Sequence, residues 1–466
     1  MDRVDDLVIG TGQAGKPLAG ALAESGRRVV VVEAHDRVGG TCVLTGCTPT
    51  KAMVASARVA HLARRAADYG VEIGDVSIDL GRVRERKRTV VDDFSSGSRR
   101  GLEKHDTLEL VFGFARFTGE RRVEVDLRAG GRRTLEAERV FVNTGTRNRV
   151  LPLDGLDAVP WLDNASIMEL DEVPEHLIVL GGGFIGLEFG QMFRRFGAEV
   201  TIVEAAGRLV GREDPEVSEA LRKMLDDDGI AIRLDSRAAA VTRHGAGVRL
   251  TVETEAGEAS IAGSHLLMAV GRVPATEGLG TDAAGIERTD RGFIRVNERL
   301  ETTAEGVWAL GDVNGGPPFT HIAYDDFRIV QRNLLEAAAP FGSGPATRDD
   351  RLVPYTLFTD PQLGRIGLTE TQAREAGHAV RIAHLPMTRV ARAIETDETR
   401  GFMKAVVDGD TDRILGAAIL GPEGGEVATI LQLAMMGDLP WTRLRDTALS
   451  HPTWGESLNN LFTTLE

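Results

Sequence analysis

The two cysteines of the chain are the side chains with the greatest potential for chemistry. Cys42 and Cys47 are separated by four residues and follow the glycine pair Gly39-Gly40. Two cysteines in any protein can be inert buried thiols, whereas a closely spaced pair can also exchange electrons through sulfur. The acidic start of the chain leads directly into an apolar strand without a visible signal or transit peptide, so we expect a cytoplasmic protein. Structural disulfides are uncommon there, and both interpretations of the pair remain open.

A glycine-rich turn precedes the cysteines and has the pattern of a dinucleotide-binding site. An apolar strand runs into Gly10, Gly12 and Gly15, a helix follows, and the next strand ends at Glu33. The first glycine permits a tight turn, the second lets the backbone approach a pyrophosphate, and the third lets the helix pack on the strand. The terminal carboxylate can accept a hydrogen bond from a ribose hydroxyl. This segment therefore predicts one dinucleotide-binding unit.

The same pattern recurs later in the chain. Gly181, Gly183 and Gly186 follow a second apolar strand, and the next strand ends at Glu204. From the first glycine to the acid the separation is 23 residues in both copies. Two dinucleotides in one chain suggest an electron relay, in which a flavin stays bound in one unit and a nicotinamide visits the other.

The cysteine segment resembles that of the flavoprotein disulfide reductases, the family of dihydrolipoamide dehydrogenase, glutathione reductase and mercuric reductase. The resemblance covers nearly the whole chain, and its further motifs occur in the family's order. These motifs are Thr144-Gly145-Thr146, Ala269-Val270-Gly271-Arg272-Val273-Pro274, Leu310-Gly311-Asp312-Val313 and His451-Pro452-Thr453-Trp454-Gly455-Glu456.

The resemblance implies a role for individual residues. Cys42 and Cys47 would form a redox-active disulfide, with Cys47 next to the flavin and Cys42 facing the substrate. The implied catalytic set also contains a salt bridge near the flavin, made by Lys51 and Glu188, and the acid/base His451, oriented by Glu456. The residues implied to bind FAD are Gly10, Gly12, Gly15, Glu33, Thr41, Ala115, Thr144, Gly145, Asp312 and Ala323. Those implied to bind the nicotinamide dinucleotide are Gly181, Gly183, Gly186, Glu204 and Gly271. No metal ligands are expected.

The resemblance also implies the architecture, an α/β fold with two Rossmann-like dinucleotide-binding domains and a C-terminal α+β dimerisation domain. The expected domains are an FAD-binding domain over residues 1–149, an NAD(P)-binding domain over 150–271, a central domain completing the FAD site over 272–343, and an interface domain over 344–466. A turn-rich connector at residues 338–345 supports the last boundary. Alternating apolar and polar residues between 108 and 142 predict an antiparallel meander.

Composition and charge restrict the partners. With 55 Lys and Arg against 70 Asp and Glu, the formal net charge of −15 opposes nucleic acid and anionic membranes. No apolar run approaches the roughly 18 residues of a membrane span. The basic run at residues 82–88 is interpreted as a solvated helix face because it contains its own acid. By resemblance we expect a homodimer whose active sites are shared between the subunits.

The substrate stays open. Glu204 favours NADH over NADPH because a carboxylate repels a 2′-phosphate, although Arg208 lies nearby. Residues 46–51 resemble mercuric-reductase relatives, but the chain has no C-terminal cysteine pair to receive the metal. The C-terminal half resembles a subgroup of bacterial reactive-chlorine-resistance flavoproteins. We predict reduction of a small disulfide, a reactive oxidant or a metal ion, with dihydrolipoamide dehydrogenase, a mercuric-reductase-like enzyme or a flavin redox sensor without turnover as alternatives.

Overall fold

The computed structural model describes residues 1–335, 345–349 and 351–465 of the chain. They form two compact units, each assembled from three separate stretches. Unit 1 contains Met1–Ala52, Arg82–Arg149 and Gly271–Arg351, and unit 2 contains Met53–Gly81, Val150–Val270 and Leu352–Glu466. The division into four domains stays a prediction. Its last boundary, at residue 343, and nearly all of the expected connector lie outside the described residues.

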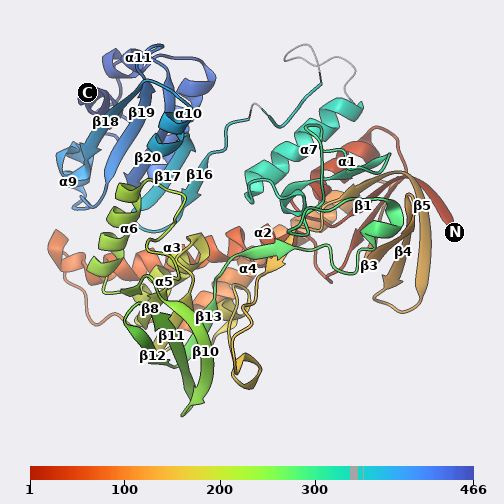
Figure 1. Ribbon diagram of the computed structural model, residues 1–466, viewed down its shortest axis with the longest axis horizontal. Helices are drawn as coiled ribbons and strands as arrows, with labels where there is room; N and C mark the ends of the chain where they lie inside the picture. The colour runs from red at the N-terminus through yellow and green to blue at the C-terminus, as the bar shows by residue number, and fades with distance from the viewer. Residues whose placement is uncertain (336–344, 350, 466) are drawn as a thin grey trace. The chain divides into compact units, whose positions relative to one another are not determined.

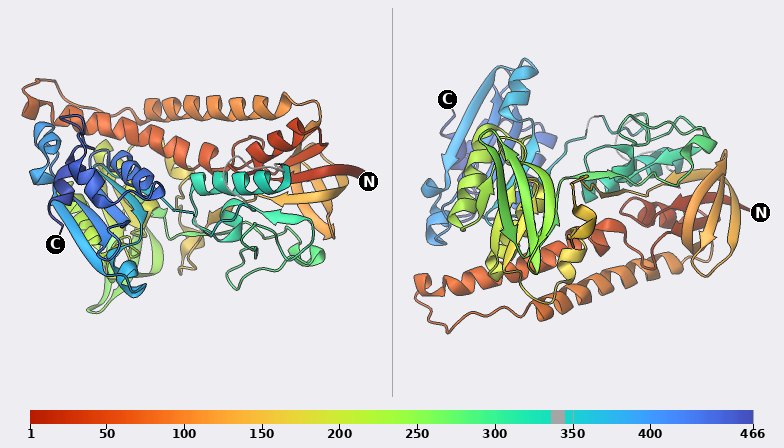
Figure 2. Two further views of the ribbon diagram at one scale, coloured as in Figure 1. Left: turned by 90° about the horizontal axis from the view of Figure 1, so that it is seen from above. Right: turned by 60° about the horizontal axis from the view of Figure 1, so that its bottom comes forward.

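Unit 1 is built on a parallel sheet with buried strands (Figure 1). β2 consists of four valines and a glutamate, all buried, as is typical of a parallel sheet with both faces covered. The parallel strands are ordered β3-β2-β1-β5-β15. β3, β4 and β5 also form an antiparallel meander, drawn in orange in Figure 2, which confirms the prediction for residues 108–142. The strands are β1 (Asp2–Ile9), β2 (Val29–Glu33), β3 (Leu108–Gly119), β4 (Arg122–Leu127), β5 (Arg132–Val142) and β15 (Val307–Ala309).

Helices α1 and α7 of unit 1 pack against the parallel sheet. Leu18 and Leu22 of α1 pack in one apolar cluster with Phe327 and Val330 of α7. A two-stranded ribbon pairs β6 (Thr146–Asn148) with β14 (Arg272–Pro274). The helices are α1 (Gly15–Glu24), α2 (Gly40–Leu44), α4 (Leu80–Glu103) and α7 (Thr320–Leu335), and α3 (Cys47–Arg64) begins in this unit.

The basic run on α4 differs from its interpretation as a fully solvated helix face. Arg82, Arg86 and Arg88 are exposed, but Lys87 is only 3% exposed. A helix that packs along one side turns some residue of any seven-residue run towards the interior, whatever its charge. The solvated face therefore excludes Lys87.

Unit 2 contains a second parallel sheet, in the order β13-β7-β8-β9, and an antiparallel three-stranded sheet, in the order β10-β11-β12. The two parallel sheets, one in each unit, confirm the predicted α/β class. The strands are β7 (His176–Leu180), β8 (Glu199–Val203), β9 (Ala231–Arg233), β10 (Arg237–His244), β11 (Gly247–Thr254), β12 (Gly257–Gly263) and β13 (His265–Met268), and the helices are α5 (Phe184–Phe196) and α6 (Pro215–Asp227).

The C-terminal part of unit 2 is an antiparallel sheet covered by helices. Its order is β16-β17-β20-β19-β18, and its apolar cluster includes Leu431 of α10 and Phe462 of α12. The strands are β16 (Tyr355–Leu357), β17 (Gln362–Gly367), β18 (Val380–Pro386), β19 (Phe402–Asp408) and β20 (Ile414–Gly421). The helices are α8 (Glu370–Glu375), α9 (Ala391–Glu395), α10 (Gly424–Met436), α11 (Trp441–Asp446) and α12 (Ser457–Phe462).

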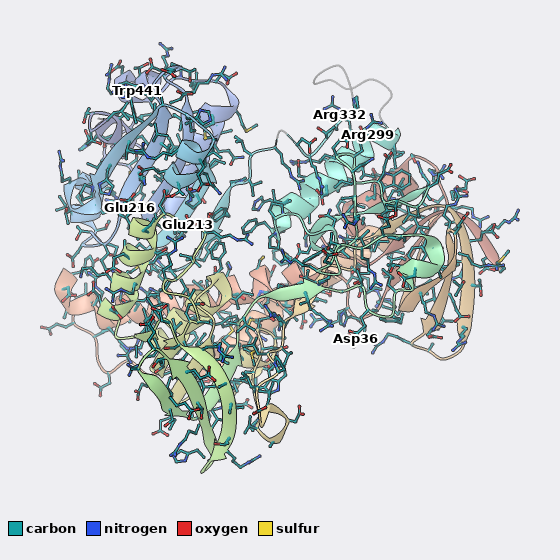
Figure 3. All side chains as sticks on the ribbon, in the orientation of Figure 1. Asp36, Glu213, Glu216, Arg299, Arg332 and Trp441 are labelled. Carbon is teal, nitrogen blue, oxygen red and sulfur yellow. The ribbon has the colours of Figure 1, made fainter. Side chains whose placement is uncertain are left out.

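A buried lysine connects α6 to this C-terminal sheet. Lys404 of β19 is 2% exposed, and its ammonium lies 3.2 Å from the Asp214 carboxylate and 2.7 Å from that of Glu370. It also pairs with Glu216 of α6, which Figure 3 labels. Asp214 in turn accepts from the backbone N–H groups of Glu370 and Thr371 at the start of α8. These contacts hold α6, which follows the second parallel sheet, and the C-terminal sheet in one unit.

In the described part of the chain, no helix combines the length and the apolar composition that crossing a membrane requires.

Candidate active site

The first glycine turn is held by a buried asparagine. Gly10 has a φ of +102°, and a Cβ on it would lie 2.4 Å from the Asn143 carbonyl oxygen, so no other residue fits there. The Asn143 side chain accepts from the Gly15 N–H at 2.9 Å and donates to the Leu310 carbonyl at 2.7 Å. Sequence analysis did not single out this residue. The available signal was a polar residue at the end of the buried strand β5, directly before Thr144.

Buried polar groups surround this turn in unit 1. Glu33 is 5% exposed at the end of β2, and its carboxylate accepts from the Thr11 N–H at 3.0 Å and the His35 N–H at 2.9 Å. The Thr144 hydroxyl is buried without a hydrogen-bond partner in the protein. Burial raises the pKa of Asp312, while the Thr146 hydroxyl donates to this carboxylate at 3.0 Å. Such groups fit a polar ligand bound beside the turn.

The other residues implied to bind FAD lie on elements of unit 1. Ala115 of β3 and Ala323 of α7 are buried, whereas Thr41 of α2 is exposed. Gly145 has a φ of +69°, and an added Cβ there would meet no atom within 4 Å. Gly271, implied for the nicotinamide, also belongs to unit 1 and has a φ of +104° with open space around it.

The second glycine turn, in unit 2, repeats this architecture. Gly181 has a φ of +107°, and a Cβ on Gly186 would lie 2.0 Å from the Gly181 carbonyl oxygen. The Glu204 carboxylate, directly after β8, accepts from the Gly182 N–H at 2.6 Å and from the Ala206 N–H at 2.8 Å. An added Cβ on Gly183 would meet no atom within 4 Å, which leaves space beside the N-terminus of α5.

Both cysteines lie in unit 1 on consecutive helices. Cys42 lies in α2 and is half-buried, and Cys47 is exposed as the first residue of α3. A hydrogen bond with Cys47, together with burial, raises the pKa of the Cys42 thiol well above its ordinary value of 9.0. The Thr320 hydroxyl lies 3.2 Å from the Cys47 sulfur. The structure thus places the two predicted cysteines on consecutive helices of one unit, where the interaction of Cys47 with Cys42 affects the pKa of the Cys42 thiol.

Two further residues near the sulfurs were missed by the sequence analysis. Thr320, the first residue of α7, contacts Cys47 across a separation of 273 positions in the sequence. Lys16 of α1 interacts electrostatically with Cys42 and donates to the Ser98 hydroxyl of α4 at 3.1 Å. The available signal for Lys16 was a lysine directly after the third glycine of the first turn.

The predicted acid/base residues form a pair within unit 2. The Nδ1 atom of His451 lies 2.9 Å from both carboxylate oxygens of Glu456, and the histidine side chain is 66% exposed. Glu188 is 7% exposed on α5 and accepts from the Phe358 N–H at 2.9 Å. Lys51 belongs to unit 1 and Glu188 to unit 2, and their salt bridge stays a prediction. The approach of His451 to the cysteines of another subunit also stays a prediction.

Among residues 1–335, 345–349 and 351–465, no cluster of three or more His, Cys, Asp or Glu side chains has the arrangement of a metal site.

Comparison with known proteins places these features in one family. Residues 4–326 match the family model "Pyridine nucleotide-disulphide oxidoreductase", and residues 353–462 match the dimerisation domain of that family. The chain is 38% identical to the probable pyridine nucleotide-disulfide oxidoreductase RclA of Escherichia coli, with 99% of each chain covered. It is 34% identical to a mercuric reductase of Streptomyces lividans, with 97% of this chain and 94% of the relative covered.

A third relative is a dihydrolipoyl dehydrogenase of Thermus scotoductus, 35% identical with 98% of this chain and 96% of the relative covered. The solved structure of the Cu(II) complex of RclA, described as an HOCl-induced flavoprotein disulfide reductase from Escherichia coli, superposes with a TM-score of 0.89. That match has 37% sequence identity and covers 99% of both chains. The matched models, the full-length relatives and the shared fold agree, and the chain belongs to the pyridine nucleotide-disulphide oxidoreductase family.

Proposed function

We propose that the chain is a reductase that passes two electrons from NADH through FAD and the Cys42 and Cys47 pair to a small disulfide or a reactive oxidant. The observation that carries this proposal is the position of both free cysteines on consecutive helices of the unit that also contains the first glycine turn. With a disulfide as acceptor, the overall reaction is R–S–S–R + NADH + H⁺ → 2 R–SH + NAD⁺. Electrons, atoms and charge balance in this equation.

FAD and NAD(P)H are the cofactors of this family, and the residues of unit 1 fit FAD. The unpartnered Thr144 hydroxyl and the buried Asp312 carboxyl offer polar groups to a ligand. The close backbone at Gly10 and Gly12, where a Cβ would lie within 2.6 Å of Asn143, suits a pyrophosphate at the turn. The residues that would hold FAD are Gly10, Gly12, Gly15, Glu33, Thr41, Ala115, Thr144, Gly145, Asp312 and Ala323. Bound FAD would accept hydride from the nicotinamide and reduce the sulfur pair.

The two sulfurs have different tasks in this proposal. Cys47 is the first residue of α3, an 18-residue helix whose dipole favours negative charge at that end. The hydroxyl of Thr320 can donate to the same sulfur. Cys42 attacks the substrate, and the Cys47 sulfur then displaces the substrate sulfur from Cys42. The pair is thereby returned to its disulfide form.

His451 supplies or removes the proton of the leaving thiol. Its Nδ1 is bound by both oxygens of Glu456, so Nε2 is available for proton exchange with a thiol. The exposed position of the ring suits an action on the cysteines of another subunit. The residues of the matched dimerisation domain include an exposed apolar stripe on α10, and we place the second copy of the chain there. Its residues are Ile430, Leu433, Met436 and, just beyond the helix, Leu439.

Glu204 supports NADH as the reductant. Its carboxylate lies beside the glycine turn, where it can accept from a free ribose hydroxyl and repels a 2′-phosphate. The Arg208 guanidinium donates to the Gly211 carbonyl at 2.9 Å, within its own loop. A tenfold or greater preference for NADPH in kcat/KM would contradict this assignment.

One relative suggests an oxidant as the acceptor to test before lipoamide. The Escherichia coli relative is described as HOCl-induced and was solved as a Cu(II) complex. By analogy, a reactive chlorine species, or a disulfide made by one, is the first acceptor to test, and Cu(II) is the second. A cytoplasmic location, where both cofactors are available, agrees with this activity.

An anaerobic titration with NADH tests the proposal. We expect the yellow holoenzyme to take up two electrons per subunit into the sulfur pair and to develop the long-wavelength absorbance of a thiolate beside a flavin. A panel of small disulfides, hypohalous oxidants, Cu(II), Hg(II) and lipoamide then ranks the acceptors. A colourless protein that does not rebind FAD would refute the proposal, and faster turnover with lipoamide than with every other acceptor would favour dihydrolipoamide dehydrogenase.

A further inference from the structure

The helices that carry Lys16 and Cys42 meet at Gly12. The N–H of Lys16 donates to the Gly12 carbonyl at 3.2 Å in the first turn of α1. On the other side of the same residue, a Cβ on Gly40 would lie 2.7 Å from the Gly12 Cα. Cys42 follows Gly40 by two positions in α2. The glycine turn therefore places the first turn of α1 directly beside the helix of the half-buried thiol.

Helix α4 is hydrogen-bonded both to the segment just before α2 and to the Lys16 side chain of α1. The Ser95 hydroxyl donates to the Val38 carbonyl at 2.8 Å, just before α2, and is 7% exposed. The Ser98 hydroxyl accepts from the Lys16 ammonium at 3.1 Å. Residues three apart are neighbours on one side of a helix, so a single strip of α4 fixes the approach to α2 and the position of the ammonium.

The charge of Lys16 has a specific electrostatic partner. Burial lowers the pKa of Lys16, and its interaction with Cys42 opposes that effect. The same interaction lowers the pKa of Cys42 and acts against the burial of the thiol. Among the described residues, no carboxylate forms an ion pair with Lys16. Among the described groups of the protein itself, a thiolate at Cys42 would therefore be the negative charge that compensates this partly buried ammonium.

We propose that Lys16 is a positioning residue for the sulfur chemistry, whose ammonium stabilises the thiolate of Cys42. This inference rests on the proposed function. In the exchange step, the Cys42 thiolate attacks one sulfur of R–S–S–R, the Cys42–S–R bond forms, and RS⁻ leaves and takes up a proton. The Cys47 thiolate then attacks the Cys42 sulfur, the intramolecular disulfide forms, and a second RS⁻ leaves. The substrate is reduced by two electrons and the cysteine pair is oxidised by two.

The chain has only two cysteines, so replacing Cys47 makes alkylation report on the Cys42 thiol alone. Cys47→Ser leaves Cys42 as the sole cysteine and removes the second thiol, whose interaction raises the pKa of Cys42. The FAD-loaded Cys47→Ser protein is alkylated with iodoacetamide across pH 6–10, with and without Lys16→Met or Lys16→Arg. Lys104→Met is the matched control, because this lysine of unit 1 has a 61% exposed side chain and its removal changes the net charge equally.

In the Lys16→Met protein, we expect the alkylation midpoint to rise by roughly 0.5–1 pH unit and the rate at pH 7 to fall about 3- to 10-fold, since one pKa unit changes the thiolate fraction tenfold. Lys16→Arg should restore at least half of that loss, and Lys104→Met should change neither value. A midpoint that Lys16→Met leaves in place would overturn the inference. So would loss of FAD from the Lys16→Met protein, because the ammonium would then serve the cofactor.

The proposed function and this inference fail in different ways. The alkylation profile does not depend on turnover, so a shifted midpoint supports the electrostatic role even if the panel reveals another acceptor. Wild-type protein that NADH cannot reduce would refute the proposed function and leave the measured effect of Lys16 on Cys42 standing.

Discussion

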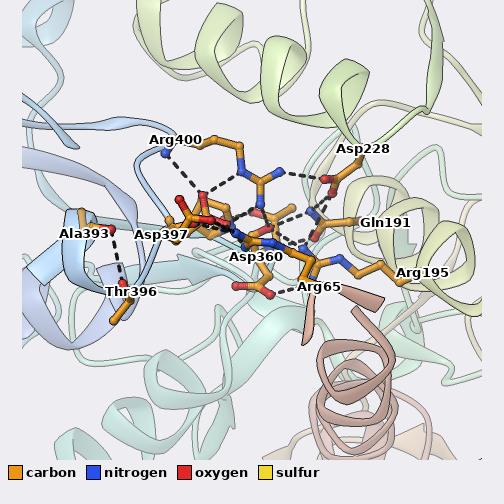
Figure 4. A network of polar contacts seen from close by, with 12 residues as sticks. Arg65, Gln191, Arg195, Asp228, Asp360, Ala393, Thr396, Asp397 and Arg400 are labelled. Atoms are coloured by element: carbon orange, nitrogen blue, oxygen red, sulfur yellow. Dashed lines mark hydrogen bonds and ion pairs between the residues drawn. The ribbon is translucent and has the colours of Figure 1, made fainter. Parts of the chain in front are cut away.

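Acidification should destabilise the protein through His61, a half-buried residue of α3 in unit 2. Burial and the nearby Arg195 lower the pKa of His61 to about 4. Asp228 and Asp360 act in the opposite direction, and Arg400 acts with Arg195. Figure 4 shows these four charged residues in one network, in which Arg195 and Arg400 contact the two aspartates. The Nε2 atom of His61 is buried without a hydrogen-bond partner, so a proton added there would be poorly stabilised.

The sign and size of the effect follow from the two pKa values. The unfolded chain binds a proton at His61 near pH 6.5 and the folded protein only near pH 4, so the unfolded state holds more protons between these values. Stability is complete above about pH 6.5 and is lost as the pH falls towards 4. At 1.36 kcal/mol per pKa unit, the full difference corresponds to about 3 kcal/mol, of which about 2 is lost by pH 5. Solvent screening of a partly exposed ring reduces the expected loss at pH 5 to about 1–2 kcal/mol.

Urea unfolding at pH 7.5 and 5.0 measures this contribution. Between these pH values, we expect the free energy of unfolding to fall by about 1–2 kcal/mol more for the wild type than for His61→Gln, with unchanged m-values. His244→Gln replaces an exposed histidine of the same unit and should behave as the wild type. If the wild type and His61→Gln lose the same free energy, the buried neutral histidine is not the cause.

Three further outcomes are expected. Cys42→Ser should reduce NADH-driven turnover at least about 10³-fold, since it removes the attacking nucleophile, while the oxidised protein keeps the long-wavelength absorbance of the Cys47 thiolate beside FAD before NADH is added. Turnover near the wild-type rate would refute direct thiol attack. Glu204→Ala should lower the ratio of kcat/KM for NADH to that for NADPH by about tenfold or more, because the charged hydrogen bond to the ribose hydroxyl of NADH and the repulsion of the 2′-phosphate of NADPH are both lost. An unchanged ratio in steady-state assays would contradict this role. Lys404→Met should lower the free energy of unfolding by about 2–4 kcal/mol, since the buried Asp214 loses its ammonium partner, whereas an unchanged urea midpoint would show that backbone donors suffice.

The parts of the fold that sequence analysis predicted well are those encoded locally. The glycine turns, the acids Glu33 at the end of β2 and Glu204 directly after β8, and the meander at residues 108–142 each depend on neighbours within a few tens of residues. The burial of Lys87 was missed because the charge pattern along a segment does not reveal which side of a helix packs against the rest of the protein. The family motifs extended the prediction to Asp312, His451 and Glu456, whose positions no local pattern specifies.

The paired glycine turns were predictable from the amino-acid sequence alone, because backbone conformations that require glycine leave a direct trace in the residue types. The order of the motifs and the close spacing of two cysteines then identified a flavoprotein disulfide reductase by resemblance to that family. Only the folded chain decided what surrounds the sulfurs. Thr320 contacts Cys47 over 273 positions, and Asn143 binds the Gly15 N–H over 128. Contacts between residues so far apart in the sequence, like the interaction of Lys16 with Cys42, depend on how separate helices pack against one sheet. The energy of a buried charge is set by that packing and not by the residues next to it in the sequence.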